Sequence, residues 1–270
     1  GIVDKNGEAL PPKTWEQFRD AAKRISAIDP GKTYGVIFPM KGSSQGEYGF
    51  FWELKVVRPT SSSFGKLYFD NNRGEYDFSF YKPLLEFMRL LREEGSVFPG
   101  EKVISDDSAR IRFGRRGNIG MYIAASWDVG VLNTQYPATI DWGVADIPVM
   151  LPNNRYQTIS ITDYGYTVSK AAAEKFPEKV MTVYRYINGP YWQKRFFEEG
   201  MFHPSLTEVY KIAQKPTIRG WNEFTDHNVI SLPVPDNVIK IKGPKWYQVF
   251  QMIYDGHLEI DSALSNLTKS

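Results

Sequence analysis

The sequence predicts an α/β protein that contains more helix than strand. Short apolar runs rich in aromatic and β-branched residues, typical of buried strands, alternate with longer segments in which apolar residues recur at helical spacing. Of the 270 residues 42% are hydrophobic, which is enough to fill one large core or two medium ones. The sequence contains no repeat of fixed period, so a repeat architecture is not predicted.

Helices are predicted from capping residues and from apolar spacing. Thr14, followed three positions later by Gln17, is a capping-box pattern that opens the first helix. Pro177 and Pro190 begin two later helices, and Gly200 ends the second of them. The other helices are expected over residues 81–94, 105–113 (closed at Gly114) and 245–255, with a last one capped at Asp261.

Strands are predicted for the short apolar runs between these helices. One of them, over residues 119–124, places Ser126, Trp127 and Asp128 just beyond its carboxyl end. Ligands bind at this position in open α/β sheets, because loops converge there. The remaining strands are expected over residues 34–39, 142–149, 156–161 and 166–169.

The charge balance argues against nucleic acid or an anionic membrane as a partner. Lys and Arg number 33 against 31 for Asp and Glu, so the formal net charge is only +2. We interpret the densest basic cluster, Arg110, Arg112, Arg115 and Arg116, as a solvated helix end. No apolar run approaches the roughly 20 residues of a membrane helix, and the first residues lack the pattern of a signal peptide.

Several kinds of chemistry lack their sequence signatures, so no cofactor, metal site or catalytic residue is predicted. The chain has no cysteine, and its three histidines have no metal-ligand spacing. The glycines fit neither a dinucleotide-binding nor a phosphate-binding loop, and no Gly-x-Ser-x-Gly motif occurs. A glycosidase places its two carboxylates by fold instead of by spacing, so glycoside hydrolase stays open as an alternative function.

The order of segments resembles the bacterial extracellular solute-binding proteins of carbohydrate ABC importers, a maltodextrin-binding-protein-like family. Each motif alone is weak, whereas the ordered set is specific and covers most of the chain. The segments that carry the resemblance are residues 12–18, 34–36, 109–113, 120–122, 126–128, 141–144, 165–170, 192–193, 197–200 and 203–205.

The resemblance implies a two-lobe periplasmic-binding-protein-like fold whose lobes are joined by hinge strands. Residues 1–150 and 207–270 would form the C-terminal lobe, called lobe two, and residues 151–206 would be a returning segment of lobe one. The remainder of lobe one would lie upstream of residue 1. The implied protein is a monomer outside the cytoplasm, periplasmic or lipid-anchored, that delivers a solute to ABC importer permease subunits and is not an enzyme.

A sugar fits the expected cleft, because pyranose rings stack on aromatic faces while their hydroxyls bond polar side chains. The resemblance implies ligand-binding roles for Trp127, Asp128, Trp246, Tyr48, Glu47, Gln45, Asp163 and Tyr164. Core packing is the alternative for the two tryptophans, and a surface loop for Gln45, Glu47 and Tyr48. The same aromatics and carboxylates would also suit a non-sugar solute such as a polyamine.

Overall fold

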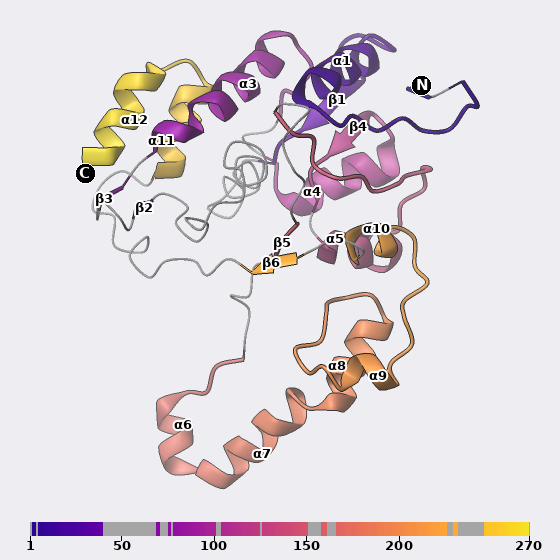
Figure 1. The fold of residues 1–270 in the computed structure, drawn as a ribbon, viewed down its shortest axis with the longest axis vertical. Helices are drawn as coiled ribbons and strands as arrows, with labels where there is room; N and C mark the ends of the chain where they lie inside the picture. The colour runs from indigo at the N-terminus through magenta and orange to yellow at the C-terminus, as the bar shows by residue number, and fades with distance from the viewer. Residues whose placement is uncertain are drawn as a thin grey trace.

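The computed structural model describes residues 2–3, 5–39, 69–70, 75–76, 78–100, 104–124, 126–150, 158–160, 166–225, 229–231 and 246–269. In these ranges helices outnumber strands, as the sequence predicts, and Figure 1 shows their arrangement. In chain order the elements are α1 (Trp15–Ser26), β1 (Tyr34–Ile37), β2 (Phe69–Asp70), β3 (Glu75–Tyr76), a 3₁₀ helix (Ser79–Tyr81), α3 (Lys82–Glu93), α4 (Asp106–Ile111), a π-helix (Arg112–Arg116), β4 (Ile119–Tyr122), α5 (Ser126–Gly130), a second π-helix (Val131–Gln135), β5 (Thr158–Ser160), α6 (Lys170–Lys175), α7 (Pro177–Ile187), α8 (Pro190–Glu198), α9 (Val209–Ile212), α10 (Trp221–Thr225), β6 (Val229–Ser231), α11 (Trp246–Tyr254) and α12 (Ile260–Lys269).

A parallel pair of strands, β1 and β4, organises the part of the chain that carries Trp127. Tyr34 pairs with Ile119 and Ile37 with Tyr122, so the two strands end at the same edge. Parallel strands need a long crossover, and here α3 and α4 lie in it. The two other described pairs are β2 with β3, antiparallel, and β5 with β6, parallel.

Helix α1 begins with the predicted capping box and lies directly on this sheet. The Gln17 backbone N–H donates to Thr14 Oγ1 at 3.2 Å, while the Thr14 N–H donates to Gln17 Oε1 at 3.3 Å. Ala22 on its buried face is so close to β1 that a Cβ added at Gly35 would lie 2.4 Å from the Ala22 Cα. The close approach of α1 to β1 therefore depends on glycine at position 35.

The largest core joins the beginning of the chain to its end. Trp15 of α1 stacks on Phe87 of α3 with ring centroids 4.6 Å apart, and Phe250 of α11 contacts Tyr81 at 5.0 Å. Residues Ile260, Ala263, Leu264 and Leu267 of α12 complete the cluster. Figure 1 shows α11 and α12 beside α3, so segments far apart in sequence share one core.

Helices α6 and α7, both described throughout, contain no buried residue and stand apart from this body (Figure 1). The helical spacing of Val180, Val183, Tyr184 and Ile187 predicts that they form a buried stripe, and this is wrong. Val183 is 59% exposed, and Val180, Tyr184 and Ile187 are only half-buried. An amphipathic helix forms here, but its apolar face is incompletely covered.

Three other predictions of local structure differ from the observed fold. Residues 142–149, all described, form no strand; Val149 alone makes a bridge, to Thr14. Residues 166–169, also described, are irregular. The last helix begins at Ile260, where Glu259, not Asp261, accepts a bond from the Ser262 N–H at 3.2 Å.

The helix predicted over residues 105–113 continues beyond its expected end. Ser105 caps α4 by accepting from the Ser108 N–H, but Gly114 lies inside the π-helix that follows. The chain turns at Gly117 instead, where φ is 63°, a left-handed conformation that glycine adopts easily. The helical segment thus reaches the turn immediately before β4.

Candidate ligand-binding site

Trp127 lies where the sequence predicts, just past the carboxyl end of β4. It is in the first turn of α5, a helix that was not predicted, and its side chain is half-buried. Since β1 and β4 are parallel and end together, Trp127 is at the sheet edge where ligands bind in open α/β folds. A partly exposed indole at this edge offers a flat apolar face for a ring-shaped ligand.

Asp128, the next residue, forms a buried ion pair that sequence reasoning missed. Asp128 is 1% exposed and its Oδ1 accepts a hydrogen bond from the Nε of Arg110, which is 8% exposed. The Nη1 of Arg110 also donates to Asp107 Oδ1 at 2.8 Å. The contact of Asp128 with a ligand stays a prediction, while its bond to α4 is a feature of the fold.

The guanidinium of Arg110 stays charged although it is buried. Burial lowers its pKa, but the negative charge of Asp128, supported by Tyr122 and Asp107, outweighs burial and leaves the pKa of Arg110 above its ordinary value. The interpretation of this arginine as part of a solvated helix end is therefore wrong.

The rest of the basic cluster is less buried than Arg110. Arg115 and Arg116 are exposed, as predicted, whereas the guanidinium of Arg112 lies 4.4 Å from the centroid of the Phe98 ring. The one signal in the sequence for a buried arginine is that Arg110 sits between Ala109 and Ile111.

The opposite side of α5 is packed against α8 and α10. Val129 is 1% exposed and shares a small core with Phe197 and Trp221. At Gly130 an added Cβ would lie 3.3 Å from the carbonyl oxygen of Gly200, so the two chain segments nearly touch. Asp128 and Val129 thus bind α5 to different neighbours, and Trp127 is held between these attachments.

A second cluster fixes the loop that follows α8. The Gln193 Oε1 accepts from the backbone N–H groups of Ser205 and Leu206 at 2.9 and 3.1 Å, and its Nε2 donates to the Asn188 carbonyl at 2.7 Å. The His203 ring stacks on Trp221 at 5.1 Å, and burial lowers the pKa of His203. These bonds hold the loop against the packing that supports α5.

Most of the other predicted site residues fall outside what the structure describes. Trp246 begins α11, but its side chain is not among the described ones, while Val249 and Phe250 of the same helix are in the core. Positions outside the described residues are Gln45, Glu47, Tyr48, Asp163 and Tyr164. Of the predicted site residues, the structure thus describes the side chains of Trp127 and Asp128, and it shows that Arg110 binds Asp128.

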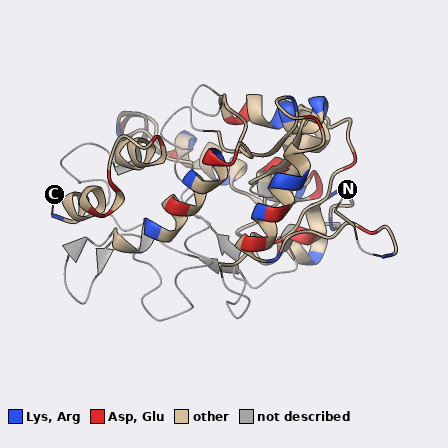
Figure 2. Ribbon diagram, turned by 90° about the horizontal axis from the view of Figure 1, so that it is seen from above, with Lys and Arg blue, Asp and Glu red and all other residues tan. Residues whose placement is uncertain are grey.

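In the described ranges, no three His, Asp or Glu side chains are grouped so as to hold a metal ion. None of the described helices has the length and hydropathy needed to cross a membrane. Figure 2 shows both signs of charge interspersed along the helices.

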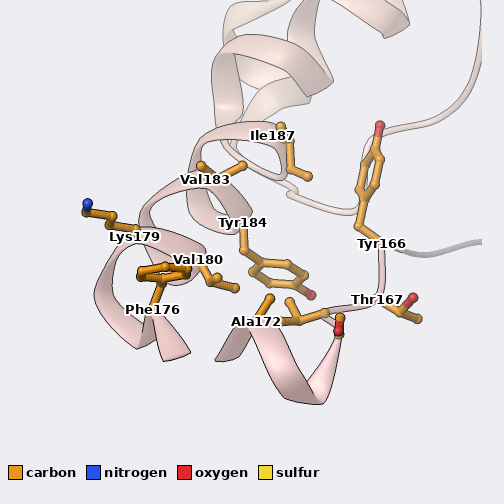
Figure 3. A pocket seen from close by; sticks show the side chains of 11 residues that line it. Tyr166, Thr167, Ala172, Phe176, Lys179, Val180, Val183, Tyr184 and Ile187 are labelled. Atoms are coloured by element: carbon orange, nitrogen blue, oxygen red, sulfur yellow. The ribbon is translucent and has the colours of Figure 1, made fainter. Parts of the chain in front are cut away.

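A hollow of about 530 Å³ lies away from Trp127, on the face of α6 and α7 (Figure 3). Figure 3 shows the Tyr184 ring between the two helices, with Phe176 and Val180 on the same side of α7. The full lining is Tyr166, Thr167, Val168, Ser169, Ala172, Phe176, Lys179, Val180, Val183, Tyr184 and Ile187. We call this lining the α6–α7 groove; most of its side chains are apolar.

Residues 2–194 match the sequence profile of a family described as bacterial extracellular solute-binding protein. The chain belongs to this family. Membership confirms the family predicted from the ordered motifs, and it places the protein outside the cytoplasm. The members of this family are binding proteins. No curated protein matches the sequence significantly.

Solved structures of similar binding proteins superpose on nearly the whole chain. Maltose-bound MalE3 of T. maritima is 17% identical, with a TM-score of 0.69, and the match covers 98% of this chain and 66% of that one. The sugar-binding protein MalE of Xanthomonas citri is 17% identical, with a TM-score of 0.68 and coverages of 99% and 65%. An ABC transporter solute-binding protein of Agrobacterium radiobacter K84, in complex with ribitol, is 14% identical, with a TM-score of 0.69 and coverages of 97% and 64%.

These likenesses confirm the predicted fold class. The chain has the fold of two-lobe solute-binding proteins and spans just under two thirds of the length of these solved structures.

Proposed function

We propose that the chain is part of the substrate-binding component of an ABC importer that captures a mono- or oligosaccharide and delivers it to the permease. The observation that carries the proposal is the half-buried ring of Trp127 at the carboxyl edge of the β1–β4 sheet, in a chain of this family. Structural neighbours crystallised with maltose and with ribitol support a polyhydroxylated ligand.

The proposed mechanism is reversible capture without any chemical step. A ligand that touches both lobes binds the closed arrangement more tightly than the open one and so shifts the population toward closure. The closed, loaded form is what the permease would then distinguish from the empty form. Trp127 is the proposed contact from lobe two. The further proposed contacts are Asp128, Trp246, Tyr48, Glu47, Gln45, Asp163 and Tyr164.

The proposed division of the chain assigns residues 1–150 and 207–270 to lobe two and residues 151–206 to lobe one. The core that joins α1 and α3 to α11 and α12 supports the first assignment. The exposed apolar faces of α6 and α7 support the second, since the rest of lobe one would cover them. The contact of Phe197 with Val129 and Trp221 marks where the two proposed lobes meet.

The α6–α7 groove is then an interior surface of lobe one and not a ligand site. Tyr186 and Val183, 60% and 59% exposed, are among the side chains that the rest of the proposed lobe one would bury. An apolar dye should bind this 270-residue chain and bind the whole gene product much less. Equal dye binding by both would contradict the assignment of residues 151–206 to lobe one.

The test of the function is a thermal-shift and calorimetric screen of the whole gene product against maltose, maltotriose, ribitol, spermidine and amino acids. A ligand that binds only the folded state raises the melting temperature by mass action. We expect a saccharide to raise it, Trp127→Ala to abolish the shift and Trp127→Phe, which keeps a flat ring, to retain part of it. A shift with spermidine alone would overturn the sugar assignment.

Glycoside hydrolase, the enzymatic alternative, has a separate test. Nitrophenyl glycosides incubated with the whole gene product should release no nitrophenol above the uncatalysed rate. Turnover that is lost on substitution of a carboxylate would replace binding by catalysis as the function. The family of binding proteins to which the chain belongs favours the first result.

A further inference from the structure

We propose that Arg110 is a positioning residue for the ligand-binding ring of Trp127, acting through the buried carboxylate of Asp128. The inference rests on the proposed function, because it assumes that Trp127 stacks on the ligand. It assigns a role to a side chain that the proposed set of ligand contacts does not include.

The directions of neighbouring side chains on a short helix are coupled to one another. Trp127 and Asp128 are consecutive in the first turn of α5, and successive helical side chains project about 100° apart. Once the Asp128 carboxylate is bound, the rotation of α5 about its own axis is fixed. The direction in which the Trp127 side chain leaves the helix is fixed with it.

The group that binds Asp128 is rigid. Arg110 uses its Nε for Asp128 and its Nη1 for Asp107, so the planar guanidinium is held by two different carboxylates. Asp107 lies on α4, three residues before Arg110 and in the first turn of that helix. Tyr122, the last residue of β4, is close enough to raise the pKa of Arg110. The pair therefore joins α4 and α5 at the end of β4.

The buried ion pair of Arg110 and Asp128 is not explained by stability alone. Burying two charges removes them from water, and apolar residues of similar volume often give equal or greater stability. The net stability of this pair is therefore a poor account of its presence. A directional link through a rigid guanidinium beside a half-buried ring instead fixes an orientation, which an apolar contact does less well.

Val129 and Gly130 supply the opposing attachment. Val129 is buried against Phe197 and Trp221, and Gly130 approaches Gly200 closely. With one side of α5 on α4 and the other on α8 and α10, the indole of Trp127 has a defined position before any ligand arrives. Such pre-organisation lowers the ordering cost of binding.

The test separates orientation from stability with a double variant. Arg110→Met combined with Asp128→Leu replaces the pair by apolar side chains and leaves no buried charge unpaired. We expect the whole gene product carrying both changes to unfold at the denaturant midpoint of the wild type, while its Kd for the saccharide found in the screen weakens at least tenfold. The matched control is Lys82→Met with Asp261→Leu, which removes an exposed pair at 2.7 Å on α3 and α12 and should leave Kd unchanged.

A ligand-free readout keeps the inference testable if no saccharide binds. The fluorescence of Trp127 is obtained by subtracting the spectrum of Trp127→Phe, in the wild type and in the double variant. We expect the emission maximum and acrylamide quenching of this ring to change in the double variant. Unchanged fluorescence, or an unchanged Kd in a folded double variant, overturns the positioning role. Because Asp128 is itself a proposed ligand contact, a weaker Kd supports that role only when the fluorescence of Trp127 changes as well. Absence of saccharide binding by the wild type defeats only the proposed function.

Discussion

The contact between α1 and β1 makes a sharp prediction for the substitution Gly35→Ala. The added Cβ would lie 2.4 Å from both the Cα and the carbonyl oxygen of Ala22, whereas ordinary van der Waals contact needs 3.4 Å or more. Both obstructing atoms are backbone, so no side-chain rotation relieves the overlap and α1 must move by about 1 Å. Overpacking typically costs about 1–3 kcal/mol, and we expect about 3 kcal/mol here.

Two other glycines calibrate this loss of stability. At Gly120 the nearest atoms belong to the side chain of Ile25, at 2.5 Å, which can change rotamer, so Gly120→Ala should cost about 1 kcal/mol. At Gly143 nothing lies within 4 Å, so Gly143→Ala should be neutral within about 0.5 kcal/mol. Urea unfolding at constant m-value measures all three. Equal midpoints for the variants at 35 and 143 would refute the reasoning.

Three further changes test other contacts. Bonding to Arg19 lowers the pKa of Glu94 from 4.5 to about 2. The stabilisation of the fold by the ionised Glu94 is therefore complete above pH 4.5 and is lost as the pH falls toward 2. We expect Glu94→Gln to cost about 1 kcal/mol at pH 7, after allowance for solvent screening, and almost nothing at pH 2. Thr14→Ala removes the N-cap of α1 and should cost about 1 kcal/mol. Gln193→Leu removes the oxygen that accepts hydrogen bonds from the backbone N–H groups of Ser205 and Leu206, which should cost about 3 kcal/mol.

Each of these changes has its own control. Glu16→Gln changes an exposed carboxylate on the same helix as Arg19 and should cost less stability at pH 7 than Glu94→Gln. A Thr14→Ser variant keeps the capping oxygen and should unfold like the wild type. Gln193→Glu keeps an acceptor oxygen, so amide exchange at residues 205 and 206 should remain slower than in Gln193→Leu. If a control variant loses as much stability, or as much protection from amide exchange, as the variant it is paired with, the contact assigned to that residue does not have the proposed effect.

Local sequence signals predicted several of the helices, because their causes are local, but they missed α5 and α6. Thr14 and Gln17 lie three residues apart and make the capping box in one turn of chain. Gly95 and Gly200 have φ of 71° and 68°, the left-handed conformation that ends helices. The strand β1 and the position of Trp127 after β4 were likewise predicted, since short apolar runs bounded by turns mark both strands.

The wrong predictions concern structure that needs a partner elsewhere in the chain. Residues 142–149 have a strand-like composition, but a strand exists only when another strand pairs with it, and here only Val149 finds a bridge. Val183 has helical spacing, yet spacing cannot say whether anything covers it. In each case the local signal was real and the tertiary contact decided the outcome.

The candidate site divides in the same way. Trp127 could be found because the end of a strand is a local feature, whereas Arg110 was misread because its partner Asp128 is 18 residues further along. Nothing in a run of basic residues tells which one folds inward. The ligand-binding roles of Trp127, Asp128 and the other predicted contacts all stay predictions.

The pairing of β5 with β6 has a consequence for the order of folding. Thr158 pairs with Val229, so a three-residue ladder closes a loop of about 70 residues. Closing so long a loop costs conformational entropy before the few ladder bonds can offset it, and non-local pairing of this kind slows folding. Helices α6 to α8 contain only local backbone bonds and form without that closure. We therefore expect the parallel β5–β6 ladder to form late, after helices α6 to α8.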